Sequence, residues 1–166
     1  MSSLPAENQK KQKAVKVGDK LPSFSLPDED GKLFCSDEYV GKHILVIFFY
    51  PKDESRYCTE EACSFRDSFV EFSEAGAVVV GINNGSMESH RHFKALHHLP
   101  YNLLTDTGNV ILKKFGVQTR LISTGRETFI VDFNGIVVHK HNSYLNGRIH
   151  AEKALEVIRG LRSASI

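Results

Sequence analysis

The sequence predicts an α/β fold in which helices flank a central mixed β-sheet, with a β-hairpin at the N-terminal end. Residues 43–50 and 77–83 form two continuous apolar runs, which are too short for typical helices and suit buried parallel strands. Between them, residues 59–76 repeat their apolar side chains with a helical period. The three segments therefore predict a βαβ unit whose two strands run parallel.

The length and composition are those of one globular domain. The chain has 166 residues, of which 41% are hydrophobic and 25% are charged, enough to bury a substantial core. Residues 1–16 are polar and rich in lysine. We therefore expect a disordered N-terminal tail over residues 1–16 and a single domain over residues 17–166.

The domain is expected to begin with the hairpin. Residues 21–26 and 32–35 alternate apolar and polar side chains on either side of an Asp-Glu-Asp-Gly turn. Cys35 lies on the second of these strands, and no partner motif accompanies it. We interpret Cys35 as a small buried side chain rather than a redox group.

Helical periods and their end signals predict the middle of the chain. The helix that follows the first long strand is expected from Thr59 to a stop at Gly76. Its apolar stripe comprises Ala62, Phe65, Phe69 and Phe72. Ser86 is expected to cap another helix, which reaches about residue 98 and turns Phe93 and Leu96 inward.

The second half of the chain completes the fold. Residues 102–105 predict a short strand, and a short helix leads from it into an irregular loop over residues 117–125. Residues 128–132 and 136–141 then predict an antiparallel hairpin, and the last helix is expected from about residue 149. A βαβ unit followed by a ββα unit is the thioredoxin fold.

Charge and cysteine content narrow the class of protein. A formal net charge of +1 gives no reason to expect nucleic acid or a membrane surface as a partner, and no apolar run approaches the ~20 residues of a membrane span. Three cysteines argue against a secreted disulfide framework and for an intracellular protein, with the cytoplasm expected and a plastid or other organelle as the alternative. Eight histidines provide no ligand spacing, so we expect neither a metal nor another cofactor.

Cys58 is the candidate nucleophile. A free thiol has a pKa near ~8.5, which is lowered at helix N-termini and beside cations. Cys58 falls in or just before the first turn of the helix that follows the strand ended by Pro51. Glu60 and Glu61 lie in the same turn and disfavour a second negative charge. A reactive Cys58 therefore requires a nearby cation.

The residues around Cys58 resemble those of a known family. Pro51, Ser55 and Cys58 match the pattern Pro-x-x-x-Thr/Ser-x-x-Cys of the peroxiredoxins. Cys63, five residues on, is similar to the second cysteine of the bacterioferritin-comigratory protein, or peroxiredoxin Q, group. Residues 125–129 resemble the segment that carries the family's active-site arginine, here Arg126. The resemblance extends over residues 17–161, although a serine replaces the usual threonine and Arg-Tyr replaces the Pro-Gly that often precedes the first cysteine.

The resemblance implies a thiol-dependent peroxidase for hydrogen peroxide and organic hydroperoxides. In the implied cycle, Cys58 becomes a sulfenic acid, condenses with Cys63 to an intramolecular disulfide, and is restored by thioredoxin or glutaredoxin. Pro51 would shield the thiolate, Ser55 would hydrogen-bond the peroxide, and Arg126 would stabilise the thiolate and the leaving oxygen. Resolution within one chain favours a monomer.

Helix geometry adds a condition to this cycle. Helical residues five apart have Cα atoms roughly 8–9 Å apart, whereas a disulfide needs less than about 7 Å, so the helix between Cys58 and Cys63 must unwind. Arg56 and Arg66 compete with Arg126 as the cation, because both are nearer in sequence. Two other functions stay open, a dithiol–disulfide oxidoreductase and a binding module with inert cysteines. The absence of a Cys-x-x-Cys motif counts against the first.

Overall fold

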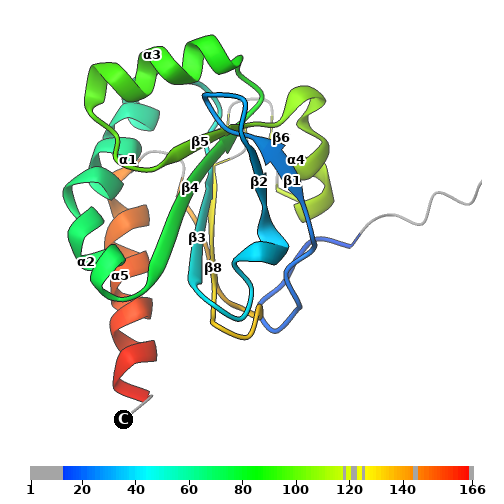
Figure 1. Ribbon diagram of the computed structural model, residues 1–166, viewed down its shortest axis with the longest axis vertical. Coiled ribbons are helices and arrows are strands. Elements are labelled where there is room, and N and C mark those ends of the chain that lie inside the picture. Colours follow the sequence, from blue (N-terminus) through cyan, green and yellow to red (C-terminus); the bar gives the residue numbers. More distant parts are fainter. Residues whose placement is uncertain (1–12, 118, 121–122, 125, 144–145, 165–166) are drawn as a thin grey trace, which may run out of the picture.

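Figure 1 shows the computed structural model, which describes residues 13–117, 119–120, 123–124, 126–143 and 146–164. The strands are β1 (Ser25–Pro27), β2 (Leu33–Cys35), β3 (Ile44–Phe49), β4 (Ala77–Asn83), β5 (Asn102–Thr105), β6 (Thr119–Arg120), β7 (Ser123–Thr124), β8 (Glu127–Val131) and β9 (Val137–Asn142). The helices are η1 (Ser36–Glu38), α1 (Arg56–Asp67), α2 (Phe69–Glu74), α3 (Met87–His97), η2 (Thr107–Asn109), α4 (Val110–Phe115) and α5 (Arg148–Ala164).

The central sheet has the strand order β5-β4-β3-β8-β9. β3 and β4 pair in parallel, which confirms the predicted βαβ unit, and β4 and β5 are also parallel. β8 is antiparallel to both β3 and β9, which confirms the predicted C-terminal hairpin. The mixed sheet with flanking helices and the separate β1–β2 hairpin are the thioredoxin-like fold that the sequence predicts.

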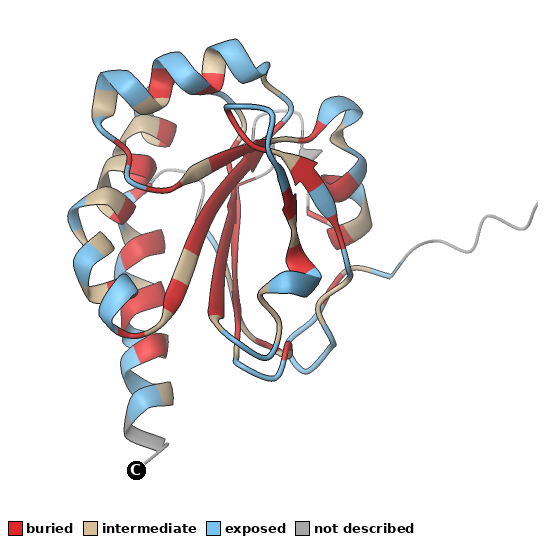
Figure 2. Ribbon diagram, viewed as in Figure 1, coloured by how far each residue is buried: buried red, intermediate tan, exposed pale blue. Residues whose placement is uncertain are grey.

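β3 divides the core into two layers, because successive side chains of a strand point to opposite faces. Ile44, Val46 and Phe48 pack with the apolar faces of α1, α2, α3 and α5. The intervening side chains of β3 pack on the other face, with the hairpin and α4. Figure 2 shows the central strands largely buried and the helices buried on one side only. β3 therefore lies between the two layers of the core.

The helix predicted over residues 59–76 is two helices. α1 begins three residues earlier than predicted, at Arg56, and the chain breaks at Ser68 before α2. The backbone of Ser68 has φ −101° and ψ 6°, outside the helical range. The break lets Phe72 pack against Phe65, with 5.8 Å between ring centroids, so that both rings are fully buried.

The inward position predicted for Leu96 is wrong, because its side chain is 55% exposed. The inward position predicted for Phe93 is confirmed, and the buried face of α3 carries His90 beside it. The ring of His97 extends this face by edge-on contact with Phe93. A histidine is polar and gives no apolar signal, so the predicted face was rotated away from the true one.

The N-terminal segment packs on the domain from before Val17, the residue at which the domain was predicted to begin. Residues 1–12 of the tail predicted over residues 1–16 lie outside the described residues. Val15 is buried, and its N–H donates to the carbonyl of Phe115 at 3.0 Å. In the region predicted as an irregular loop, residues 119–120 and 123–124 pair as the antiparallel strands β6 and β7.

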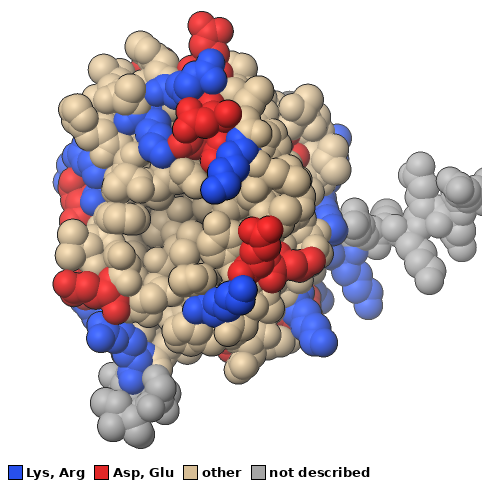
Figure 3. Space-filling model, viewed as in Figure 1, with Lys and Arg blue, Asp and Glu red and all other residues tan. Residues whose placement is uncertain are grey.

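No helix among the described residues is long and apolar enough to cross a membrane. On the face shown in Figure 3, acidic and basic side chains lie close to one another between larger uncharged areas. This mixture agrees with the formal net charge of +1.

The start of α5 lies directly against the first turns of α1. The Ser64 hydroxyl donates to the carbonyl of Arg148 at 3.2 Å. A Cβ atom on Gly147 would lie 2.4 Å from the carbonyl oxygen of Tyr57 and 2.6 Å from the amide nitrogen of Glu61. Only glycine fits there, because both neighbours are backbone atoms that cannot swing aside.

We predict that Gly147→Ala lowers the free energy of unfolding by about 1–3 kcal/mol, as overpacking does. Gly160→Ala is the matched control, since Gly160 is exposed on α5 and a Cβ atom there would meet no other atom within 4 Å. That change should raise stability by about 0.5–1 kcal/mol. Urea unfolding of both variants tests the difference, and equal effects would contradict the contact with α1.

Candidate active site

Cys58 lies in the first turn of α1, just after the chain that connects β3 to this helix. Ser55 is the N-cap residue of α1, and its carbonyl accepts the N–H of Thr59 at 2.8 Å. Cys58 is the third residue of the helix, in the turn whose N–H groups lack intrahelical acceptors and favour a negative charge. Its side chain is fully buried.

Arg126 supplies the cation that a reactive Cys58 requires. It lies immediately before β8 and is 5% exposed. Its Nη2 donates to the Cys58 sulfur at 3.1 Å, and its Nη1 donates to the Glu61 carboxylate. A buried, charge-assisted contact of this kind stabilises a thiolate far more than an exposed one.

The two competing arginines are engaged elsewhere. Arg56 lies 3.7 Å from a Glu60 carboxylate oxygen and stacks over the Tyr57 ring. Arg66 donates to Asp67 at 3.0 Å and to the carbonyl of His97 at 2.8 Å. Neither Arg56 nor Arg66 contacts the Cys58 sulfur through these interactions.

Glu60 and Glu61, which the sequence analysis treated alike, lie in different environments. Its side chain is fully buried, whereas that of Glu60 is 32% exposed. Burial raises the pKa of Glu61 to about 8, although the neighbouring Arg126 acts to lower it. The signal was present in the sequence, because Cys58, Glu61, Ala62 and Phe65 fall on one helical face and all are buried.

Ser55 and Pro51 lie in the segment that leads to Cys58. The Ser55 hydroxyl donates to the carbonyl of Lys52 at 3.2 Å, so Ser55 caps the helix through its backbone and not through its side chain. Pro51 is half-buried at the end of β3. The structure therefore places both residues beside the start of α1, with the Ser55 hydroxyl turned to the backbone of its own turn.

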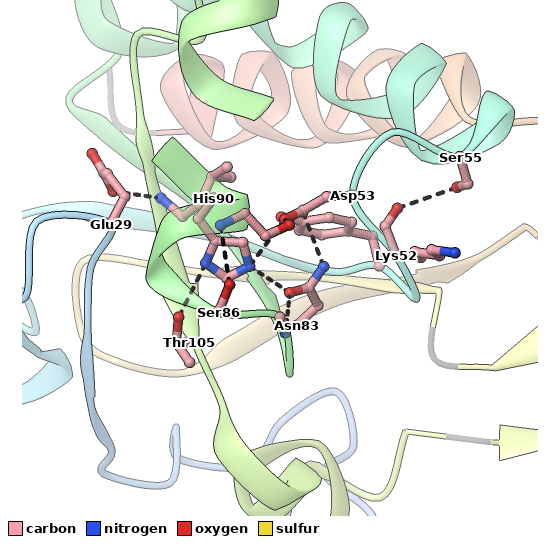
Figure 4. A network of polar contacts seen from close by, with 12 residues as sticks. Glu29, Lys52, Asp53, Ser55, Asn83, Ser86, His90 and Thr105 are labelled. Atoms are coloured by element: carbon pink, nitrogen blue, oxygen red, sulfur yellow. Dashed lines mark hydrogen bonds and ion pairs between the residues drawn. The ribbon is translucent and has the colours of Figure 1, made fainter. Parts of the chain in front are cut away.

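Asp53 holds the segment between β3 and α1 in place through buried hydrogen bonds, as Figure 4 shows. Its carboxylate is buried and accepts hydrogen bonds from the Tyr50 hydroxyl at 2.6 Å, the Asn83 amide at 3.1 Å and the Ser89 hydroxyl at 2.7 Å. The imidazole of His90 also bonds the Asn83 side chain. Burial lowers the pKa of His90, so the imidazole is neutral in this network. The segment before Ser55 is thus tied to both β4 and α3.

Cys63 occupies a different face of α1. It is half-buried and lines a hollow of about 630 Å³ between α1 and the start of α5, together with Arg66 and Arg148. Burial raises the pKa of the Cys63 thiol, with Asp67 adding to the rise and Arg66 opposing it. The intact helix keeps its thiol apart from that of Cys58.

All three cysteines are free, and Cys35 is half-buried at the end of β2. Cys35 is therefore less buried than the sequence analysis expected. Over the described ranges, no group of three or more His, Cys, Asp or Glu side chains is arranged to hold a metal ion.

The AhpC/TSA family matches residues 17–140 of the chain, about three quarters of its length. The chain belongs to this family. The chloroplastic peroxiredoxin Q of Sedum lineare is 40% identical to it over 150 residues, which cover 89% of this chain and 80% of that protein. This peroxiredoxin is therefore a thiol-dependent peroxidase of the peroxiredoxin Q group.

Solved structures of similar proteins share the fold. The crystal structure of the peroxidoxin BcpB from Mycobacterium tuberculosis has a TM-score of 0.81 and 32% identity, and the match covers 89% of this chain and 98% of that one. A second structure is that of the bacterioferritin comigratory protein of Xanthomonas campestris, which was studied for its alkyl peroxide reduction activity. It has a TM-score of 0.77 and 27% identity, and the match covers 86% of this chain and 99% of that one.

We predict that Arg126→Ala moves the ultraviolet titration of the Cys58 thiolate to higher pH and slows peroxide reduction by about 10²–10³-fold. The removed guanidinium is the cation that contacts the sulfur. Glu60→Gln is the control, because its exposed carboxylate is screened by water, and it should change the rate little. An unchanged titration in Arg126→Ala would mean that another group stabilises the thiolate.

Proposed function

We propose that Cys58 is the peroxidatic cysteine and that Arg126 activates it. The observation that carries this proposal is the 3.1 Å contact between Arg126 Nη2 and the Cys58 sulfur in the first turn of α1. Helix N-terminus and guanidinium both favour the thiolate, which is the nucleophilic form. Peroxidase activity in this family agrees with such a site.

The first step is attack on the peroxide. The Cys58 thiolate forms a bond to one peroxide oxygen, and the O–O bond breaks to leave a sulfenic acid and a hydroxide or alkoxide. That anion takes up a proton and departs as water or an alcohol. Arg126 would stabilise the charge on the leaving oxygen, Ser55 would hydrogen-bond the peroxide, and Pro51 would shield the thiolate from water.

Cys63 is proposed as the resolving cysteine. Its thiolate would attack the Cys58 sulfur, break the S–O bond and release water as a disulfide forms. Helical residues five apart have Cα atoms roughly 8–9 Å apart, more than the ~7 Å limit of a disulfide. The first turns of α1 therefore unwind during resolution, and α1 has a folded and a locally unfolded state.

The proposed substrates are hydrogen peroxide and organic hydroperoxides. Alkyl peroxide reduction in the similar protein of Xanthomonas campestris supports the second class. A dithiol protein such as thioredoxin or glutaredoxin would reduce the disulfide, in service of antioxidant defence. We place the enzyme inside the cell, in the cytoplasm or, as in the plant relatives named chloroplastic, in an organelle.

We predict that Cys58→Ser abolishes peroxide reduction, whereas Cys63→Ser keeps a single turnover of thiol oxidation. Cys58 has the contact with Arg126, and Cys63 acts only after the sulfenic acid has formed. Stopped-flow oxidation without reductant measures both variants. Cys35→Ser serves as the control and should behave like wild type; the reverse order of the first two variants would exchange the assignments.

We also predict that the enzyme works as a monomer, because both redox cysteines lie on one helix of one chain. After peroxide treatment, non-reducing electrophoresis should show a monomer band that gains an internal disulfide. A dimer band that collapses on reduction would place the resolving thiol on another subunit.

A further inference from the structure

Three buried side chains form a cluster that contacts Arg126 through Glu61, and none of them has a role in the proposed mechanism. Glu61 of α1 and His150 of α5 are fully buried, and Thr128 of β8 is nearly so. His150 Nδ1 lies 2.7 Å from the Thr128 hydroxyl and 3.5 Å from Glu61 Oε1. Through Glu61, this cluster connects with Arg126 and so with the Cys58 sulfur.

The tautomer of His150 follows from its partners. Its Nε2 lies 3.0 Å from the carbonyl oxygen of Ser143, and a carbonyl oxygen only accepts. Burial lowers the pKa of His150 to about 4, so the imidazole is neutral and its single proton is on Nε2. Nδ1 therefore presents a lone pair, which accepts the hydrogen of the Thr128 hydroxyl.

This tautomer leaves one oxygen of Glu61 without a donor. Arg126 donates to Oε2, but Oε1 has no hydrogen-bond partner among the described residues. Oε1 lies 3.5 Å from His150 Nδ1, but this nitrogen carries no hydrogen, so the two groups do not form an ion pair. A buried oxygen without a donor disfavours the carboxylate and favours the protonated acid.

The charges of the cluster lead to the same protonation state. Arg126 is one buried cation between two acids, Glu61 and Cys58. With one of these acids ionised the group is neutral, and with both ionised it carries a buried negative charge that is costly to desolvate. Glu61 and Cys58 thus compete for one guanidinium.

We propose that His150 is a positioning residue that keeps the proton of this cluster on Glu61, so that the Arg126 charge is left to the Cys58 thiolate. The inference rests on the proposed role of Cys58 and deepens it. A hydrogen-bond donor in place of the His150 Nδ1 lone pair would stabilise the Glu61 carboxylate, which would then take a larger share of the guanidinium.

The other ionisable groups that face the cluster do not supply the missing proton donor. The Tyr101 hydroxyl, from the segment before β5, donates to the carbonyl of Ala62, and burial raises its pKa. His141 of β9 meets His150 edge-on, with 5.0 Å between ring centroids. Burial lowers the pKa of His141, so this ring is also neutral at pH 7.

The first test is Glu61→Gln, with the Cys58 thiolate titrated by ultraviolet absorbance against a Cys58→Ser blank. If Glu61 is already neutral in the wild type, a neutral amide leaves the titration unchanged. A shift to lower pH would show that Glu61 is ionised beside the thiolate, and a shift to higher pH would show that its negative charge is needed. Either shift overturns the proposal.

The second test compares two replacements of His150. His150→Asn places an amide donor where Nδ1 now accepts, so it should stabilise the Glu61 carboxylate and move the thiolate titration up by about one pH unit. His150→Leu offers no donor and should move the titration much less than His150→Asn, although it disrupts more hydrogen bonds. A purely structural role predicts the opposite order.

Controls separate this inference from its alternatives. His139→Asn changes a histidine of β9 outside the cluster and should not move the titration. His150→Asn combined with Glu61→Gln should cancel the upward shift, and persistence of the shift would contradict the proposal. Failure of Cys58→Ser to abolish turnover would refute the proposed function instead, so the two failures are distinguishable.

Stability provides a readout if the His150 variants do not fold. Because burial raises the Glu61 pKa from 4.5 to about 8, the folded state holds the proton more tightly than the unfolded state. The free energy of unfolding should fall as pH rises from about 4.5 toward 8. Glu61→Gln should remove that fall, and an identical pH profile in the variant would overturn the proposal.

Discussion

A single buried guanidinium holds the reactive end of this fold together. Arg126 stands at the start of β8 and donates to two side chains of α1, one turn apart on the same helical face. Arg126 therefore joins the sheet to α1, and its positive charge neutralises whichever of Cys58 and Glu61 is ionised. Burial makes this contact strong, since water does not screen it, and it also makes the site intolerant of a second negative charge.

The neighbouring elements restrict how the segment around Cys58 can move. On one side the Asp53 carboxylate fixes the chain before α1 through three hydrogen bonds. On the other side Gly147 brings the start of α5 against the backbone of the first turn. Unwinding of α1 has to break the contact with Gly147 and the contact with Arg126, whereas the Asp53 network lies outside the helix and need not open.

The sequence predicted most of the fold, because the two apolar strands and the helix between them carry strong local periods. It also predicted Cys58 and Arg126, the first from its place after a strand and the second only from family resemblance. It missed the burial of Glu61, His90 and His150, since polar side chains give no apolar signal. Their burial depends on partners far away in sequence, such as Arg126 for Glu61. The break between α1 and α2 at Ser68 could not be predicted either, because no glycine or proline marks it in the sequence.

The break at Ser68 would limit how far α1 unwinds when the proposed disulfide forms. α1 ends at Asp67, and α2 is anchored separately by Phe72, whose ring is fully buried. Helix melting is cooperative along an uninterrupted run of hydrogen bonds, so an interruption confines it. The proposed disulfide would therefore disorder α1 while α2 and the sheet stay native, and the unwinding would be confined to the twelve residues of α1.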